Sequence, residues 1–268
     1  MDPIIYAVLI VSGIGLFAGV GLGIANRFMA VKKNETAEKI ASILPGANCG
    51  GCGFSGCAGY AEALSQSKNL KTNLCVVGGD KTAKEISELL GVTAASAEKK
   101  TAFVKCRGSF DATEKTGAYQ GIRSCKAASM LYGGAGACRY GCIGFGDCVD
   151  ACEYGAMSVR NGVAVADASL CVACGKCVKT CPKRLITLLP ASFATAVPCS
   201  NPDKGADTRK VCKAGCIGCK MCEKVCESGA ITVENGLATI DPDKCTGCGK
   251  CAEACKMGVI YSVSRKET

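Results

Sequence analysis

Cysteine content is the feature that most constrains this chain: 24 of its 268 residues are cysteine, and none is histidine. Most cysteines fall into groups separated by two or three residues, and several groups have or approach the spacing C-x2-C-x2-C-x3-C. That spacing is typical of [4Fe-4S] sites, because three closely spaced thiolates reach one cluster while the fourth reaches a neighbouring cluster. Cys171, Cys174, Cys177 and Cys181 form such a run, followed by Pro182. The sequence therefore predicts an iron-sulfur protein.

Two other uses of cysteine fit the pattern less well. Disulfides are typical of small secreted scaffolds, but runs of four cysteines at such short gaps cannot all pair internally without strain. Structural zinc sites usually join two separated C-x2-C pairs, so a third cysteine at another short gap is more than such a site needs. The absence of histidine excludes histidine-ligated haem and Rieske centres.

The formal net charge of +9 counts every thiol as neutral. An oxidised four-thiolate [4Fe-4S] centre carries about −2, so five centres would bring the chain close to neutrality. The sequence contains no long Lys/Arg run and no basic stripe interleaved with aromatic residues. We therefore expect no nucleic-acid partner.

The amino-terminal segment, residues 4–25, is almost entirely apolar and as a helix would be about 33 Å long, enough to span a bilayer. Arg27, Lys32 and Lys33 follow it, whereas only Asp2 precedes it. The positive-inside rule then places the amino terminus outside and the cysteine-rich part in the cytoplasm. A cleaved secretory signal is the alternative, but the segment lacks a basic start and is longer than a usual signal core. We expect a single-pass anchor in the cell membrane, residues 1–27.

Residues 28–91 are predicted to form a small helical domain with one cluster. Its cysteines are separated by gaps of two, four and 17 residues, and intervening glycines let the backbone wrap closely around inorganic sulfide. Asn34 is expected to cap a first helix, and a later helix from about Lys81 to Leu90 should end at Gly91. Residues 92–102, rich in Ala, Ser, Glu and Lys, are predicted to be a linker.

An internal repeat organises the remainder of the chain. Residues 152–181 match residues 226–255 at a constant offset of 74, without a gap. Each copy contains two short alternating segments around an Asn-Gly turn, which predicts a β-hairpin between two cluster loops. The expected fold class is α+β: a transmembrane helix, a small helical [4Fe-4S] domain and two ferredoxin-like two-cluster domains, residues 103–198 and 199–268.

Exchange of the fourth cysteine between the two runs of each ferredoxin-like domain, together with the single-cluster domain, gives five predicted clusters. Aligned without gaps, Phe145 stands where Cys219 does, so we expect Cys138 to supply the missing ligand. The predicted sets are Cys49, Cys52, Cys57 and Cys75; Cys138, Cys142, Cys148 and Cys181; Cys152, Cys171, Cys174 and Cys177; Cys216, Cys219, Cys222 and Cys255; and Cys226, Cys245, Cys248 and Cys251. Four cysteines remain, Cys106, Cys125, Cys199 and Cys212, and either hold a sixth cluster or are buried thiols without iron.

The order of these parts resembles a known family. An apolar segment, then LPGANCGGCGFSGC with the distant Cys75, then repeated ferredoxin runs, is similar over the whole chain to the B subunit of Rnf complexes, in the longer form found in anaerobes. The NCGGCG motif also resembles the cluster domain of corrinoid iron-sulfur proteins, but no further domain here could hold a corrinoid. The chain departs from the usual ferredoxin run at 138–148, and Glu153, Glu227 and Lys256 replace the usual proline.

The resemblance implies an electron-transfer subunit of a membrane-bound ferredoxin:NAD oxidoreductase that translocates sodium ions or protons. Electrons would come from reduced soluble ferredoxin, which we expect to meet the carboxy-terminal pair, and would pass to membrane subunits and finally to flavin and NAD subunits. The chain has no nucleotide-binding glycine fingerprint, so we expect it to bind no flavin or NAD and to carry no catalytic residue. The alternatives are a polyferredoxin-type subunit of another membrane reductase and a free-standing iron-sulfur reductase.

Overall fold

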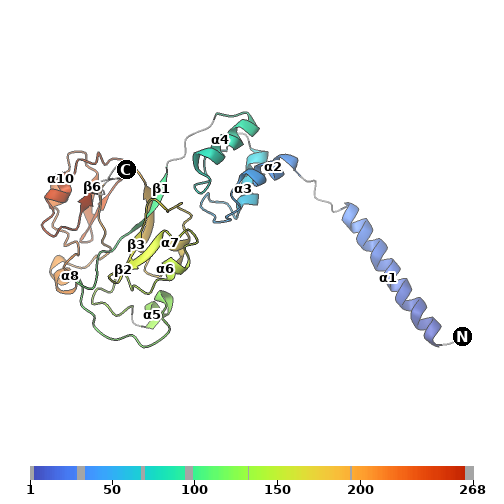
Figure 1. Cartoon of the computed structure of the whole chain (residues 1–268), viewed down its shortest axis with the longest axis horizontal. Helices are drawn as coiled ribbons and strands as arrows, with labels where there is room; N and C mark the ends of the chain where they lie inside the picture. The colour runs from blue at the N-terminus through green and yellow to red at the C-terminus, as the bar shows by residue number, and fades with distance from the viewer. Residues whose placement is uncertain are drawn as a thin grey trace.

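Three parts follow one another along the chain in the computed structural model, which describes residues 3–28, 34–67, 70–93, 99–131, 133–193 and 195–262. A single long helix comes first, a unit of three helices second, and a part built from short strands and short helices third (Figure 1). The order of helical and mixed parts agrees with the predicted α+β class. The second and third parts of the structure therefore correspond to the groups of cysteines in the sequence.

Helix α1 (Pro3–Phe28) contains the apolar amino-terminal segment. Its described large side chains are exposed, and Phe17 keeps 83% of its surface accessible. Over the residues that the structure describes, no helix combines the length and the apolar character needed to cross a membrane. Asp2, Lys32 and Lys33, on which the predicted orientation depends, lie outside the described residues.

The second part packs α2 (Glu35–Ile43), α3 (Cys57–Gln66) and α4 (Gly79–Leu90) around a small core that includes Ile40 and Tyr60. The predicted caps are confirmed. The side chain of Asn34 accepts a hydrogen bond from the N–H of Ala37 at 3.3 Å, which satisfies one of the free amides at the start of α2. Gly91 ends α4 in a left-handed conformation with φ 65°. Helix α4 begins two residues earlier than predicted.

Both predicted hairpins are present. Strand β2 (Met157–Arg160) pairs with β3 (Val163–Ala166), and β6 (Ile231–Glu234) pairs with β7 (Leu237–Ile240), both antiparallel. The Asn and Gly residues of each two-residue turn all have positive φ, as a type I′ turn requires. The turns thus impose the same hairpin in both copies of the repeat.

Two further sheets were not predicted. Strand β1 (Lys100–Val104) pairs with β4 (Ile186–Pro190), and β5 (Thr195–Ala196) pairs with β8 (Tyr261–Ser262). Each sheet therefore joins a strand at the start of one ferredoxin-like unit to a strand at its end.

These sheets change two predicted boundaries. Residues 100–102 belong to β1 and not to a linker, and residues 94–98 of the predicted linker lie outside the described residues. Strand β5 belongs with the second unit, so that unit begins before residue 199. The reason is that both strands gain partners from the far end of their own unit, which no local pattern in the sequence reports.

Short helices begin or end beside the cysteines of the third part. They are α5 (Cys125–Leu131), α6 (Asp147–Asp150), α7 (Lys176–Thr180), α8 (Gly205–Val211), α9 (Met221–Lys224) and α10 (Lys250–Glu253). The buried cores contain cysteines as well as aliphatic residues: Cys148 and Cys177 lie in the first unit, and Cys222 and Cys251 in the second. The cysteine sites and the cores therefore occupy the same space.

A close backbone approach holds one cluster loop against the hairpin turn in each unit. A Cβ added to Gly144 would collide with the carbonyl oxygen of Gly162, and one added to Gly218 would lie 2.7 Å from the carbonyl oxygen of Gly236. Gly144 and Gly218 also have positive φ, 81° and 63°. Both requirements exclude a side chain at these two repeat-equivalent positions.

We predict that Gly144→Ala destabilises the iron-loaded chain by about 3 kcal/mol, because it adds a steric collision to an unfavourable φ. Gly155→Ala is the matched control, since Gly155 has φ 62° but nothing within 4 Å of an added Cβ. It should cost only about 1 kcal/mol. Anaerobic thermal unfolding measures both variants, and equal losses of stability would contradict the proposed close approach.

Candidate iron-sulfur sites

The helical unit gathers Cys49, Cys52, Cys57 and Cys75. The side chain of Asn48 accepts a hydrogen bond from the N–H of Cys57 at 2.8 Å, which fixes the cysteine loop to the start of α3. The hydroxyl of Tyr60 donates to the carbonyl of Lys71 at 2.7 Å and accepts from the N–H of Leu74 at 3.3 Å, which holds the loop that carries Cys75. Burial, with smaller contributions from the charges of the other three cysteines, raises the pKa of Cys75. These four residues form the predicted set.

In the first ferredoxin-like unit, one cavity is lined by Cys152, Cys171, Cys174 and Cys177, which is again the predicted set. The sulfur of Cys171 accepts hydrogen bonds from the N–H groups of Ala102 at 3.3 Å and Ala173 at 3.4 Å. Such N–H donors stabilise negative charge on a thiolate. Strand β1, which supplies Ala102, is therefore part of this site.

The second cavity of this unit differs from the prediction. It is lined by Cys125, Cys142, Cys148 and Cys181, so Cys125 stands where we had expected Cys138. Burial is the main cause that raises the pKa of Cys148 to about 12, and the charges of Cys142, Cys125 and Cys181 add to it. The four sulfurs therefore influence one another.

An insertion explains how Cys125 reaches this cavity. The segment 107–137 is much longer than its counterpart 200–211 in the second unit, and it contains α5, which begins at Cys125. The carboxylate of Asp147 accepts hydrogen bonds from the N–H of Cys125 at 2.7 Å, the N–H of Lys126 at 3.0 Å and the hydroxyl of Ser124 at 2.8 Å. Burial acts to raise the pKa of Asp147, but these hydrogen bonds outweigh it and lower the pKa.

Asp147 therefore fixes the start of α5 and the position of Cys125. Two features of the sequence indicate this arrangement. The segment 107–137 is longer than its counterpart, and Phe145 stands where the second unit has a cysteine.

Cys138 instead lines a cavity with Cys106, Cys199 and Cys212, between the two ferredoxin-like units. Cys142 also borders this cavity, where its N–H donates to the sulfur of Cys106 at 3.3 Å. An added Cβ on Gly108 would lie 3.6 Å from the sulfur of Cys106 and 3.7 Å from that of Cys212, so the two units bring these sulfurs to the same place.

The second unit repeats this pattern. The N–H of Cys216 donates to the sulfur of Cys199 at 3.3 Å, as that of Cys142 does to Cys106 in the first unit. Burial raises the pKa of Cys106 to about 12. Cys138 and Cys212 are also related by the repeat, so the cavity takes two matching cysteines from each unit.

The second unit holds the remaining two predicted sets. Cys216, Cys219, Cys222 and Cys255 line one cavity. Burial and then the charges of Cys245 and Cys248 raise the pKa of Cys251, and Cys226 packs against the same core. Cys219 and Cys248 are the two exposed cysteines, whereas the other 22 are buried or partly buried.

The residues present fit [4Fe-4S] clusters. All 24 cysteines are free, and four cavities are each lined by at least four of them. Sulfur-only sites are those that select iron-sulfur clusters or zinc. Among the described residues, no three His, Cys, Asp or Glu side chains are grouped closely enough to hold a single metal ion. Four thiols around a cavity, with backbone N–H groups directed at the sulfurs, are the donor set that a cubane cluster uses.

Two of the three residues that replace the usual proline join neighbouring loops. Glu153 forms an ion pair with Lys176, and Glu227 forms the equivalent pair with Lys250 at 2.5 Å. Each pair connects the end of one cysteine run to the helix that begins within the other. Both carboxylates and Lys250 are solvent-exposed, and Lys176 is half-buried, so we assign these pairs little stability.

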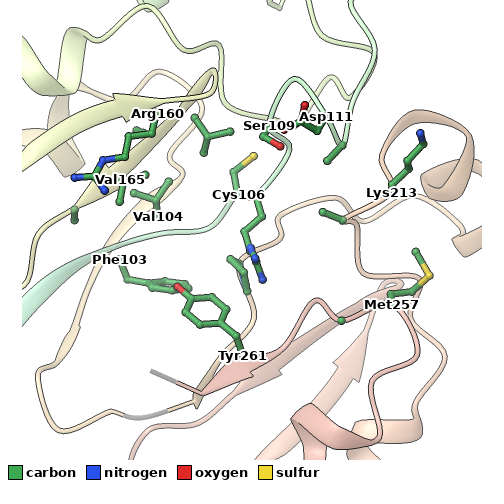
Figure 2. A pocket seen from close by; sticks show the side chains of 18 of the residues that line it. Phe103, Val104, Cys106, Ser109, Asp111, Arg160, Val165, Lys213, Met257 and Tyr261 are labelled. Atoms are coloured by element: carbon green, nitrogen blue, oxygen red, sulfur yellow. The ribbon is translucent and has the colours of Figure 1, made fainter. Parts of the chain in front are cut away.

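A larger cavity of about 680 Å³ also lies between the two units (Figure 2). In this view Val104, Arg160 and Val165 lie on one side, and Lys213 and Met257 on the other. The guanidinium of Arg107, another lining residue, stacks over the ring of Tyr261 at 5.2 Å. Cys106 borders both this cavity and the four-cysteine cavity between the units. No motif in the sequence predicted this space.

Known protein families match three of these regions. Residues 44–77 match a family described as a putative Fe-S cluster, residues 164–187 match a 4Fe-4S binding domain, and residues 215–259 match a 4Fe-4S dicluster domain. The matches cover loops from the helical unit and from both ferredoxin-like units.

Whole-chain relatives are more specific. The chain is 43% identical to the B subunit of the ion-translocating oxidoreductase complex of Methanosarcina acetivorans, over 90% of this chain and 91% of the relative. It is 39% identical to the B subunit of the Na(+)-translocating ferredoxin:NAD(+) oxidoreductase complex of Acetobacterium woodii, over 91% of this chain and 73% of the relative. For the B subunit of the proton-translocating complex of Clostridium ljungdahlii, the identity is 38% over 90% of this chain and 85% of the relative. The chain therefore belongs to the B-subunit family of the ion-translocating ferredoxin:NAD oxidoreductase (Rnf) complexes.

Proposed function

We propose that this chain is the iron-sulfur electron-transfer subunit of a membrane-bound, ion-translocating ferredoxin:NAD oxidoreductase. It accepts electrons from reduced ferredoxin and relays them to membrane and flavin/NAD subunits. The four cavities that are each lined by at least four cysteines carry the proposal, and the names of the relatives support it. Those names differ in the transported ion, so the proposal includes no choice between sodium ions and protons.

We further propose six clusters. Each bound cluster would supply a site that takes up and releases one electron. The proposed ligand sets are Cys49, Cys52, Cys57 and Cys75; Cys125, Cys142, Cys148 and Cys181; Cys152, Cys171, Cys174 and Cys177; Cys106, Cys138, Cys199 and Cys212; Cys216, Cys219, Cys222 and Cys255; and Cys226, Cys245, Cys248 and Cys251. The set with ligands from both units would place a cluster between the cluster pair of the first unit and that of the second, and so join the two pairs into one relay.

Double cysteine variants distinguish these sets from those expected from the sequence. Cys138→Ala combined with Cys142→Ala should remove two clusters and lower iron from about 24 to about 16 atoms per chain, because the two residues serve different clusters. Cys125→Ala combined with Cys142→Ala should remove only one cluster and leave about 20. Iron and sulfide analysis of the anaerobically purified chain measures both.

The opposite pattern, about 20 for the first double variant and about 16 for the second, would restore Cys138 to the set with Cys142. Wild-type iron near 20 would remove the sixth cluster altogether.

The donor end of the relay is proposed to be the carboxy-terminal unit. Cys219 and Cys248, the exposed cysteines, both lie there, and a cluster bound at either would be close to the surface. Lys220 is exposed directly after Cys219. An exposed cation beside an exposed site attracts an anionic electron carrier and raises its rate of association.

Lys220→Glu should slow reduction of the complex by ferredoxin, because the reversed charge repels the anionic carrier. The effect should shrink as salt is added, since exposed charges are screened over about 10 Å at 0.1 M ionic strength. Lys210→Glu on α8, where Lys210 is likewise exposed, is the control. Stopped-flow reduction at low and high salt measures both, and an unchanged rate in Lys220→Glu would move the donor site elsewhere.

Helix α1 is proposed to anchor the chain in the membrane, with the cysteine-rich part on the cytoplasmic side. A helix of 26 residues is about 39 Å long, which exceeds the hydrocarbon thickness of about 30 Å. The structure describes the side chains of this helix without interruption only from Leu9 to Ile24. The sequence that flanks this run is also mostly apolar. Exposed apolar side chains along the whole described run support a lipid environment.

Phe17→Lys should weaken membrane association, because a lysine at the centre of a spanning helix costs about 3 kcal/mol. Leu89→Lys is the control, since Leu89 is an exposed apolar residue of α4, outside the proposed anchor. The chain expressed without partner subunits should stay with membranes after a carbonate wash in the control and be released in Phe17→Lys. Retention of both variants would contradict the anchor.

A further inference from the structure

The helical unit touches the first ferredoxin-like unit at one cysteine loop of each. The ammonium group of Lys179, in α7, donates a hydrogen bond to the backbone carbonyl of Cys49 at 3.2 Å. An added Cβ on Gly51 would lie 3.9 Å from the carbonyl oxygen of Cys174 and 4.0 Å from that of Ala173. The loops of two four-cysteine groups therefore lie next to each other, with a gap at Gly51 that an added Cβ would just fill.

The internal repeat provides a comparison surface in the same molecule. The counterpart of Lys179 is Glu253, and the counterpart of Ala173 is Gly247. Cys174 is buried, with 9% of its surface accessible, whereas its counterpart Cys248 is exposed. The two copies are thus nearly identical in cysteine spacing but differ in charge and burial at this one face.

We propose that this face is an electron-transfer junction, at which Lys179 holds the Cys49–Gly51 loop against the Cys171–Cys177 loop. The proposal rests on the proposed function and adds to it the place where electrons pass between the ferredoxin-like units and the helical unit. One electron leaves the group of Cys171 and arrives at the group of Cys49, and no bond forms or breaks. The equivalent face of the second unit has Glu253 in place of this lysine, so it lacks the group that makes the contact.

The chemistry of the contact fits this role. A lysine ammonium beside two groups of thiolates offsets part of their negative charge, which would otherwise push the loops apart. Gly51 has no side chain and Ala173 has only a methyl group, so both residues allow the two loops to lie close together. A glutamate at position 179 would remove the donor and add repulsion.

Photo-crosslinking tests the contact without depending on activity. A diazirine-bearing lysine analogue that keeps the ammonium group, placed at position 179 of the full iron-loaded chain, should crosslink to the peptide that contains residues 49–51. The same analogue in place of Glu253 is the matched control and should give no crosslink to that peptide. Equal crosslinking from both positions, or none from position 179, would overturn the contact.

Paramagnetic resonance of the reduced wild-type chain tests the electron-transfer role. Magnetic coupling between the cluster of the helical unit and a neighbouring one should be present, and should be lost in Lys179→Glu but kept in Lys210→Glu, with iron near 24 per chain in all three. A wild-type chain with full iron and no such coupling would overturn the junction while leaving the relay intact. A wild-type chain without clusters would overturn the proposed function itself.

Discussion

Desolvation of cysteine sulfur is the constraint on which the rest of this structure depends. Burial raises the pKa of Cys106 and Cys148 to about 12 and those of Cys177 and Cys222 to about 11. Groups of four buried thiolates cannot persist near one another unless metal supplies the opposing charge. Because cysteines lie in or against the hydrophobic cores, we expect folding to be coupled to metal binding. A small aliphatic core then suffices in each unit, since the metal sites replace the aromatic residues that larger cores contain.

Local signals in the sequence predicted the local structure. The Asn-Gly turns specify their hairpins because positive φ at both positions is a property of the two residues themselves, and Asn34 and Gly91 specify helix ends for the same kind of reason. The presence of Cys125 in place of Cys138 in the lining of the second cavity of the first unit escaped prediction because it depends on Asp147, whose hydrogen bonds to the start of α5 join segments far apart in sequence. Strand β1 escaped for a similar reason: its partner β4 lies beyond both cysteine runs of the unit.

The repeat also explains why four cysteines looked left over. A gapless comparison pairs Cys138 with Cys212, and the structure places both in one cavity, with Cys106 and Cys199 completing the set. Each of these last two sulfurs accepts a hydrogen bond from the cysteine that begins the next run, Cys142 or Cys216. A duplicated unit thus generates a new site at its own interface from residues that serve no site within one copy, and Cys125 fills the place that Cys138 leaves.

Divergence after duplication gives the two units different surroundings, and this asymmetry bears on the order of the sites in the proposed relay. In the first unit, Lys179 and the loop of the helical unit cover the face around Cys174; in the second unit, Glu253 stands at the equivalent place and Cys248 is exposed. A carrier from solution can therefore approach the second unit closely, whereas the first unit is already in contact with the part of the chain that follows α1. Because electron tunnelling requires short separations, the relay that we propose would run from the exposed carboxy-terminal unit, through the shared cavity, to the helical unit nearest the amino-terminal helix in sequence.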